Sequence, residues 1–120
     1  MGQVRIEKVQ ELMKHEISRM ILQELKDPRI GFVTVTQVEV TGDLRMAKIY
    51  VSFMGNEKDA KLTLQGLQSS LGYIRRELGK RIRLRYVPEI SFVPDESLMY
   101  SEHIQKLLNE VEAEESGEEK

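Results

Sequence analysis

Six basic side chains lie close together in one short stretch of this chain, and they are the residues whose types could do chemistry. Residues 75–85 contain a single acid, Glu77, among Arg75, Arg76, Lys80, Arg81, Arg83 and Arg85. Five of the six bases are arginine, whose planar guanidinium group pairs with two oxygens of a phosphate. Such a cluster binds a polyanion through its phosphates and does not by itself recognise a base sequence. The stretch indicates a polyanionic partner, although a solvated helix face could have the same composition.

The charges are unevenly distributed along the 120 residues. The formal net charge is −2, but residues 110–120 carry six acids and one lysine, so the rest of the chain has a net charge of +3. A basic body with an acidic end favours a polyanion-binding protein, and it also fits a solubilising tail. Because the tail has little apolar content, we expect residues 110–120 to be disordered. Residues 1–109 are enough for one domain and too few for two.

The sequence lacks the usual catalytic and metal-binding constellations. It has no cysteine, and its two histidines, His15 and His103, are far apart in the chain. The glycine spacings fit neither the dinucleotide-binding motif nor the P-loop. No carboxyl group stands in an apolar context that would raise its pKa for acid–base catalysis. We therefore expect no catalytic residue, no metal and no cofactor. Since neither a leader peptide nor an apolar run of about 20 residues is evident, we also expect a cytoplasmic protein that does not enter a membrane.

The elements that position the basic residues can be predicted from the apolar pattern. One-sided apolar spacing predicts a helix over residues 6–25, which ends before Pro28. Residues 32–40 and 44–53 have the composition and alternation of two strands, and the turn between them predicts a hairpin. The alternation of the first strand changes phase, so we expect a β-bulge near Gln37.

Residues 60–82 have helical periodicity but contain glycines in the middle, which would weaken a continuous helix. We expect two helices that meet at a bend at Ser70-Leu71-Gly72, with one straight helix as the alternative. If Gly72 permits an unusual backbone angle or a close approach of helix and sheet, its replacement by valine should destabilise the protein by more than the propensity difference. On these helices Arg76 and Lys80 would point away from the apolar side.

Residues 83–92 alternate between apolar and polar side chains and predict a third strand, with Arg83 and Arg85 on one face and Pro88 at an edge or a bulge. A last helix would follow, with Asp95 or Ser97 as its cap. The predicted fold is therefore an α+β domain in two layers, with the order α-β-β-α-(bend)-α-β and a C-terminal helix. Its β-α-α-β unit resembles the core of the KH fold, although the G-x-x-G loop that clamps nucleic acid there is missing.

Several long blocks of the chain resemble ribosome-binding factor A, a family of bacterial small-subunit assembly factors. The matching blocks are LKDPRIG (25–31), VTGDLRMAKIYVSF (40–53), the bend SLG with GYIRRELGKRIRLRYVPEISF (70–92), and PDES (94–97). That family resembles a type II-like KH domain in which a small-x-Gly bend replaces the G-x-x-G loop. In this chain the bend is Ser70-Leu71-Gly72, where the family more commonly begins with alanine.

The resemblance implies a function that composition and spacing do not show. Members of the family associate with free 30S subunits, contact 16S rRNA in the neck region and work alongside assembly GTPases. They promote late 30S maturation and processing of the 5′ end of the 16S rRNA precursor, above all in the cold. They are not known as enzymes. We accordingly expect a non-catalytic, monomeric factor in the cytoplasm; a KH-like protein–protein adaptor that does not bind RNA is the alternative.

The expected RNA contacts come from the bend and the basic stretch, and we expect about half of the basic residues to touch RNA. The candidates are Ser70, Gly72, Arg75, Arg76, Lys80, Arg81, Arg83 and Arg85, with Arg5, Lys8 and Arg45 as weaker ones. Tyr73 could stack on a base, but packing is the favoured role for it. Because only 6% of the residues are aromatic, the sequence favours recognition of structured RNA through shape and phosphates over single-strand stacking.

Overall fold

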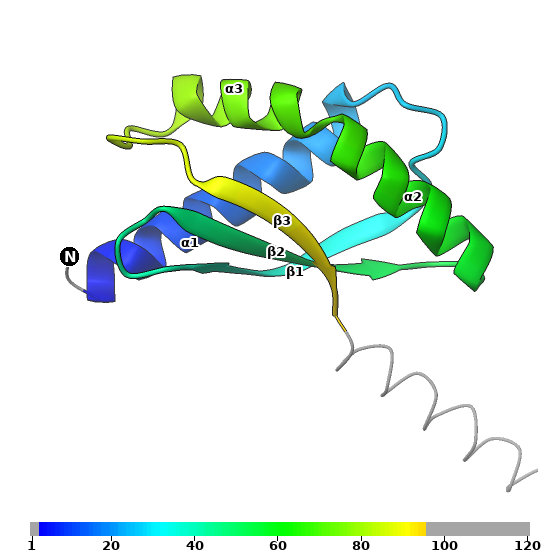
Figure 1. Cartoon of the computed structure of the whole chain (residues 1–120), viewed down its shortest axis with the longest axis horizontal. Coiled ribbons are helices and arrows are strands. Elements are labelled where there is room, and N and C mark those ends of the chain that lie inside the picture. The colour runs from blue at the N-terminus through cyan, green and yellow to red at the C-terminus, as the bar shows by residue number, and fades with distance from the viewer. Residues whose placement is uncertain (1–2, 96–120) are drawn as a thin grey trace, which may run out of the picture.

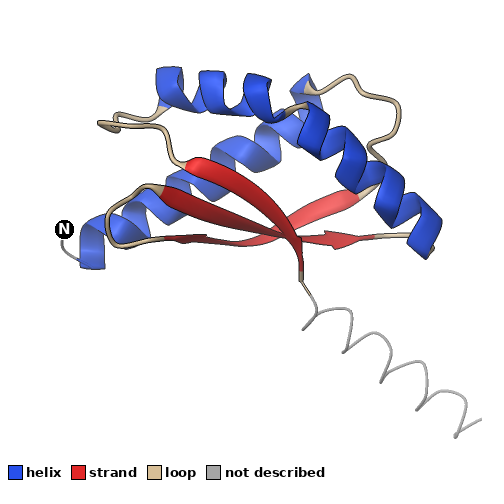
Figure 2. Ribbon diagram, viewed as in Figure 1, coloured by secondary structure: helices blue, strands red, loops and turns tan. Residues whose placement is uncertain are grey.

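A three-stranded sheet with its helices on one face makes up the part of the chain that the computed structural model describes, residues 3–95 (Figures 1 and 2). The elements in chain order are α1 (Gln3–Arg19), the π-helical turn η1 (Met20–Glu24), β1 (Val33–Val40), β2 (Met46–Phe53), α2 (Glu57–Ser69), α3 (Leu71–Arg81) and β3 (Glu89–Pro94). This order confirms the predicted two-layer α+β arrangement with a helical pair between the second and third strands. The expected C-terminal helix and the acidic tail lie outside the described residues.

The sheet has the order β1-β2-β3, with β1 and β2 antiparallel and β2 and β3 parallel. A parallel neighbour requires a crossover connection, which the α2–α3 pair provides. The pairing of β1 with β2 shifts between Val35 and Gln37, so the predicted bulge is confirmed. Thr36 lies at this shift, and its hydroxyl donates a 3.3 Å hydrogen bond to the carbonyl oxygen of Tyr50. The bulge explains why the apolar alternation of β1 changes phase.

The third strand is shorter than its apolar alternation predicts. It begins at Glu89, whose N–H donates to the carbonyl oxygen of Arg45, and it ends with Pro94. Pro88 has no N–H to offer a ladder, so pairing begins only after it. The expectation that Arg83 and Arg85 share a strand face is therefore wrong, since both lie in the loop of residues 82–88 that follows α3.

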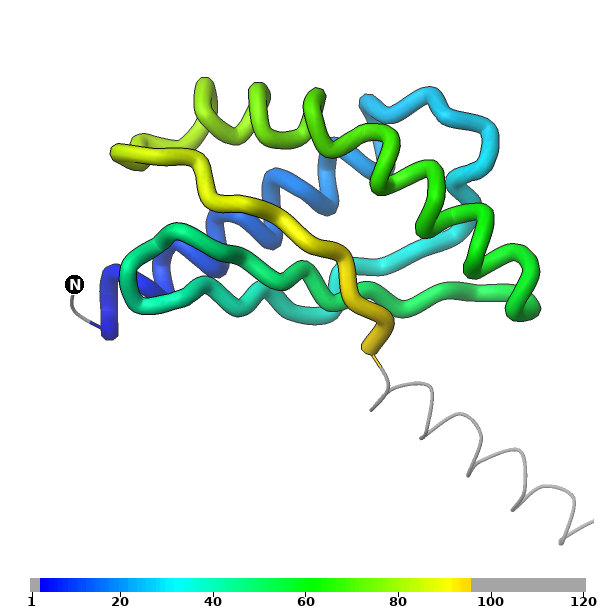
Figure 3. Tube along the Cα trace, viewed as in Figure 1, coloured from blue at the N-terminus to red at the C-terminus, as the bar shows by residue number. Residues whose placement is uncertain are grey.

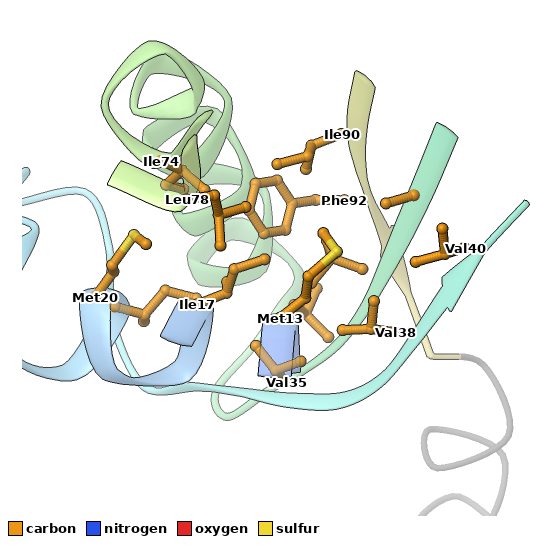
Figure 4. Packing of buried hydrophobic residues seen from close by; sticks show 14 of the residues in the cluster. Met13, Ile17, Met20, Val35, Val38, Val40, Ile74, Leu78, Ile90 and Phe92 are labelled. Atoms are coloured by element: carbon orange, nitrogen blue, oxygen red, sulfur yellow. The ribbon is translucent and has the colours of Figure 1, made fainter. Parts of the chain in front are cut away.

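The core lies between the helices and the sheet, and it orients α3. Ile74 and Leu78, one helical turn apart, are buried and point from α3 toward Ile17 and Phe92 (Figure 4). Burying a side chain of this size stabilises the folded state by about 1.5–3 kcal/mol, so this face of α3 stays packed in the core. The opposite face of α3 consequently points outward.

The helical pair is broken at Ser70, as the glycine content predicted. The tube trace changes direction between α2 and α3 (Figure 3). The break does not depend on Gly72 in the way we expected. A Cβ added at Gly72 would meet nothing within 4 Å, and among the described glycines only Gly55 has a positive φ, +109°. The close approach occurs instead at Gly66, where an added Cβ would lie 2.7 Å from Cγ1 of Ile30. The expectation that Gly72 permits an unusual backbone angle or a close approach is therefore wrong, and the close approach is found at Gly66.

Candidate nucleic-acid interface

The outward face of α3 carries two of the predicted basic residues. Arg76 is exposed, and its guanidinium carbon lies 5.8 Å from the ring centroid of Tyr73. The side chain of Lys80 is 65% exposed, and its Nζ lies 3.4 Å from a carboxylate oxygen of Glu77. A surface ion pair of this kind contributes little to stability and is readily exchanged for another partner. Arg76 and Lys80 are thus placed where a phosphate can reach them.

Arg81, by contrast, is held by carboxylates of the protein itself. Its guanidinium group donates two hydrogen bonds to Glu24, at 2.6 and 2.9 Å, one of 2.9 Å to Glu77 and one of 3.3 Å to Glu16. The hydroxyl of Tyr73 donates a further 2.6 Å bond to Glu24. The hydrogen bonds from Arg81 and then Tyr73 lower the pKa of Glu24 from 4.5 to about 2. We call Arg81, Glu16, Glu24, Glu77 and Tyr73 the Arg81 cluster.

The Arg81 cluster connects α3 to α1 and η1, since Glu16 and Glu24 belong to these N-terminal elements. The side chain of Arg81 is 25% exposed, and its pKa is raised chiefly by the hydrogen bonds to Glu24. Its donors are already used in a bidentate pair and two further contacts, which is a strong arrangement for a guanidinium group. Arg81 therefore links α3 to α1 and η1 through its ion pairs.

Arg75 positions the loop that carries the remaining bases. Its Nε and Nη2 donate to the carbonyl oxygens of Pro88 and Val87, at 3.2 and 3.1 Å. Its Nη2 also lies 3.9 Å from the carboxylate of Glu89. These contacts fasten the end of the 82–88 loop against α3, and they leave the Arg75 side chain 40% exposed.

Arg83 and Arg85 are exposed in that loop, and neither has an ion pair within residues 3–95. The same holds for Arg76 and for Arg45, which lies in the turn before β2. Arg45 and Arg85 both lie over the ring of Tyr86, with guanidinium carbons 5.3 and 5.6 Å from its centroid. Sequence reasoning missed Tyr86, because its alternation with arginine suggested a strand residue that faces the core; in the structure it is 54% exposed.

The bend lies at the other end of α3, about 16 Å from its last residue at 1.5 Å per residue. Ser70 is half-buried there, and its hydroxyl donates to the carbonyl oxygen of Gly66 at 2.9 Å. Gly72 is exposed in the first turn of α3. Of the weaker candidates, Arg5 and Lys8 are exposed near the start of α1.

The described part of the chain contains no group of three histidine, cysteine or acidic side chains that could hold a metal ion. Within the same residues, no helix is long and apolar enough to cross a membrane.

Comparisons with known proteins agree on one family. The sequence model of the family described as ribosome-binding factor A matches residues 5–108. Ribosome-binding factor A of Natranaerobius thermophilus is 50% identical over 111 residues, which cover 92% of this chain and 85% of that protein. The crystal structure of ribosome-binding factor A from Thermus thermophilus superposes with a TM-score of 0.65 at 26% identity, over 74% of this chain and 93% of that one.

A second structure of the Thermus thermophilus factor is a homology model that was fitted into a cryo-electron microscopy map of a complex with the 30S subunit. It superposes with a TM-score of 0.51 at 26% identity, and the match covers 68% of this chain and 90% of that one.

Proposed function

The chain belongs to the ribosome-binding factor A family, and from this premise we propose that it is a non-catalytic factor that binds the 30S ribosomal subunit through 16S rRNA. The observation that carries the RNA contact is that Arg76, Arg83 and Arg85 are all exposed; we call these three arginines together the open basic surface. These guanidinium groups have no carboxylate partner in the described part of the chain, so phosphates can take that place. A 30S complex of the Thermus thermophilus relative supports the choice of partner.

The bend adds a second contact to this proposal. The first turn of a helix attracts phosphate through its N–H groups and its dipole. A Cβ added at Gly72 would meet nothing within 4 Å, so a phosphate has room beside this residue in the first turn of α3. Ser70 shapes the bend through its bond to Gly66 and contributes less directly. Lys80 belongs to the same outward face as Arg76, whereas Arg75 and Arg81 act mainly by holding the loop and the helices in place.

The finer function follows the family. We propose that the protein associates with free 30S subunits late in their maturation and that it supports processing of the 5′ end of the 16S rRNA precursor. It would act as a monomer in the cytoplasm, alongside assembly GTPases, and matter most at low temperature. Loss of the protein should then leave immature 16S rRNA and free subunits, with the largest excess in cold-grown cells.

The direct test compares two charge-reversed variants in 30S binding. We expect the double variant Arg76→Glu/Arg83→Glu to bind 30S subunits at least about tenfold more weakly, because each lost charged hydrogen bond has a cost of that order. The slope of affinity against salt should fall by about one per lost phosphate contact. The matched control is Lys58→Glu/Lys61→Glu, which makes the same charge change on exposed positions of α2.

If both double variants weaken 30S binding equally, the effect comes from net charge alone, and the open basic surface is not the RNA contact. If the wild-type protein binds 30S subunits with little dependence on salt, the adaptor alternative is favoured over RNA binding. If it has no preference for 30S over 70S particles, the proposed association with free subunits is wrong.

A further inference from the structure

A hollow of about 500 Å³ lies between the turn of residues 41–45 and the 82–88 loop, beyond the C-terminal end of α3. Its walls include Arg45, Met46, Tyr86 and Glu89. The volume lies within the range of small-molecule sites, which is about 300–1,000 Å³, and it can accommodate one nucleotide. The hollow shares no residue with the Arg81 cluster and lies at the opposite end of α3 from Gly72.

Two of the side chains that line the hollow, Tyr86 and Met46, are apolar and exposed to solvent. The ring of Tyr86 is 54% exposed, and Met46 beside it is 57% exposed. Arg45 and Arg85 lie 5.3 and 5.6 Å from the ring centroid, which is within reach of a cation–π contact but farther than a tight stack. Single-strand binders combine aromatic rings, on which bases stack, with cations that hold the phosphates. A base that stacks on Tyr86 takes the place of one of the two guanidinium groups over the ring, and that arginine is then available to a phosphate.

The contrast with Tyr73 supports this interpretation. Tyr73 also has an arginine over its ring, Arg76 at 5.8 Å, but its hydroxyl is bonded to Glu24 and its ring packs against the core. Tyr86 has no hydrogen bond from its hydroxyl within residues 3–95, and it is not part of the core cluster. Packing therefore explains the position of Tyr73 and leaves that of Tyr86 unexplained.

The walls of the hollow are held in place by backbone contacts. The N–H of Glu89 donates to the carbonyl oxygen of Arg45 at 2.8 Å, which joins the turn to the end of the loop. Arg75 fixes the carbonyl oxygens of Val87 and Pro88 from the other side. Within the turn, the N–H of Thr41 donates to the carbonyl oxygen of Met46, and the N–H of Met46 donates to the hydroxyl oxygen of Thr41. A site whose walls are already fixed loses less entropy when a ligand binds.

Two carboxylates also line the hollow, and they affect which base would fit. Asp43 accepts hydrogen bonds from the Thr41 hydroxyl and the Arg45 N–H, so its carboxylate is already engaged within the turn. The side chain of Glu89 is 75% exposed and can accept a hydrogen bond from an amino group. Cytosine offers such an amino group to a carboxylate, whereas uracil offers none.

We propose that this hollow binds one unpaired nucleotide of the RNA, with the base on Tyr86 and the flanking phosphates at Arg45 and Arg85. The proposal rests on the proposed function, and it adds a second class of contact to the phosphate contacts of the open basic surface. Glu89 favours a base with an exocyclic amino group. The protein then recognises single-stranded RNA at one end of α3, a mode that the low aromatic content of the chain does not suggest.

The test measures binding of labelled eight-nucleotide oligocytidylate, oligouridylate and a blunt RNA duplex by fluorescence anisotropy. We expect Tyr86→Leu to bind oligocytidylate about tenfold more weakly, the size of one lost stacking contact, and to bind the duplex unchanged. Tyr86→Phe should keep wild-type affinity because it keeps the ring. Wild type should prefer oligocytidylate to oligouridylate, and Glu89→Gln should reduce that preference. Tyr73→Phe is the control for a tyrosine outside the hollow and should bind as wild type does.

A second readout does not depend on the stability of the leucine variant. The chain has no tryptophan, so Tyr86→Trp introduces a single reporter, whose fluorescence a stacked base should quench. No quenching at saturating oligocytidylate, or equal losses for single strand and duplex in Tyr86→Leu, would overturn the proposal. These outcomes leave 30S binding and its salt dependence untouched. Conversely, failure of wild type to bind 30S subunits would overturn the proposed function without bearing on the quenching result.

Discussion

The α2–α3 pair has a closed side and an open side, and the same residue types occur on both. On the closed side, a Cβ added at Gly66 would lie 2.7 Å from Ile30; on the open side, one added at Gly72 would meet nothing within 4 Å. Arg81 on the closed side has three carboxylate partners, whereas Arg76 on the open side has none in the described residues. The comparison teaches that the residues packed against a glycine or an arginine determine whether it is structural or free to bind.

The glycines should give the largest difference between the two sides. We expect Gly66→Ala to lower the free energy of unfolding by about 1–3 kcal/mol, because the added methyl group overpacks the contact with Ile30. Gly72→Ala should be neutral or raise it by up to about 1 kcal/mol, since alanine is the better helix former and the space is open. Urea unfolding of both variants checks this. Similar values for the two would mean that the sides do not differ in packing.

The arginines should show the next largest difference, in opposite directions for stability and binding. Arg81→Met leaves Glu16, Glu24 and Glu77 close together without their cation, so the melting temperature should fall by several degrees. Arg76→Met should leave the melting temperature within about one degree of wild type, since it is a surface change. For 30S binding we expect the opposite order. Arg76→Met should weaken binding more than Arg81→Met does, when both are measured below the melting temperature of Arg81→Met. If Arg81→Met weakens 30S binding more than Arg76→Met does, Arg81 contacts RNA after all.

Acid should weaken the closed side selectively. The pKa of Glu24 in the folded protein, about 2, is below its ordinary value of 4.5, so the folded state binds the proton less readily than the unfolded state does. The stabilisation from Glu24 is therefore complete above about pH 5 and is lost as the pH falls from about 4.5 to 2. Urea unfolding of Glu24→Gln should show a shallower loss over this range than wild type.

Asp27 also loses its stabilising effect in acid, because hydrogen bonds from Arg29 lower its pKa from 3.8 to about 2. This loss is the same in wild type and in Glu24→Gln. The difference between wild type and Glu24→Gln is therefore the quantity that reports on the Arg81 cluster. Arg76→Met should follow the wild-type pH curve. An identical pH dependence for all three proteins would contradict the role of Glu24.

The acidic end of the chain should have the smallest effect on stability. Removal of residues 112–120 takes away five acids and one lysine. We expect an unchanged melting temperature, because this composition cannot bury apolar surface, and a modest rise in non-specific RNA affinity at low salt. Differential scanning calorimetry and anisotropy on the same preparations test both parts. A large drop in melting temperature would show that the segment supports the domain.

Local patterns were sufficient to predict most of the elements. The helix before Pro28, the hairpin, the bulge beside Gln37 and the break at Ser70 each follow from apolar periodicity and from glycine and proline positions within a few neighbouring residues. The blocks shared with ribosome-binding factor A were sufficient to recognise the family. The start of β3 was predicted too early, because Leu84 and Tyr86 alternate as a strand does although pairing with β2 begins only at Glu89.

The sequence by itself therefore determined the elements, their order and the concentration of bases after Gly72. Only the tertiary structure decided that Arg81 pairs with Glu16 and Glu24, that Gly66 is the tightly packed glycine, and that Tyr86 lies exposed between Arg45 and Arg85. The physical reason is the separation along the chain of the residues that determine each property. Helical and strand periodicity depends on neighbours within a few residues, whereas the state of a charged or aromatic side chain depends on which distant segments the fold brings next to it.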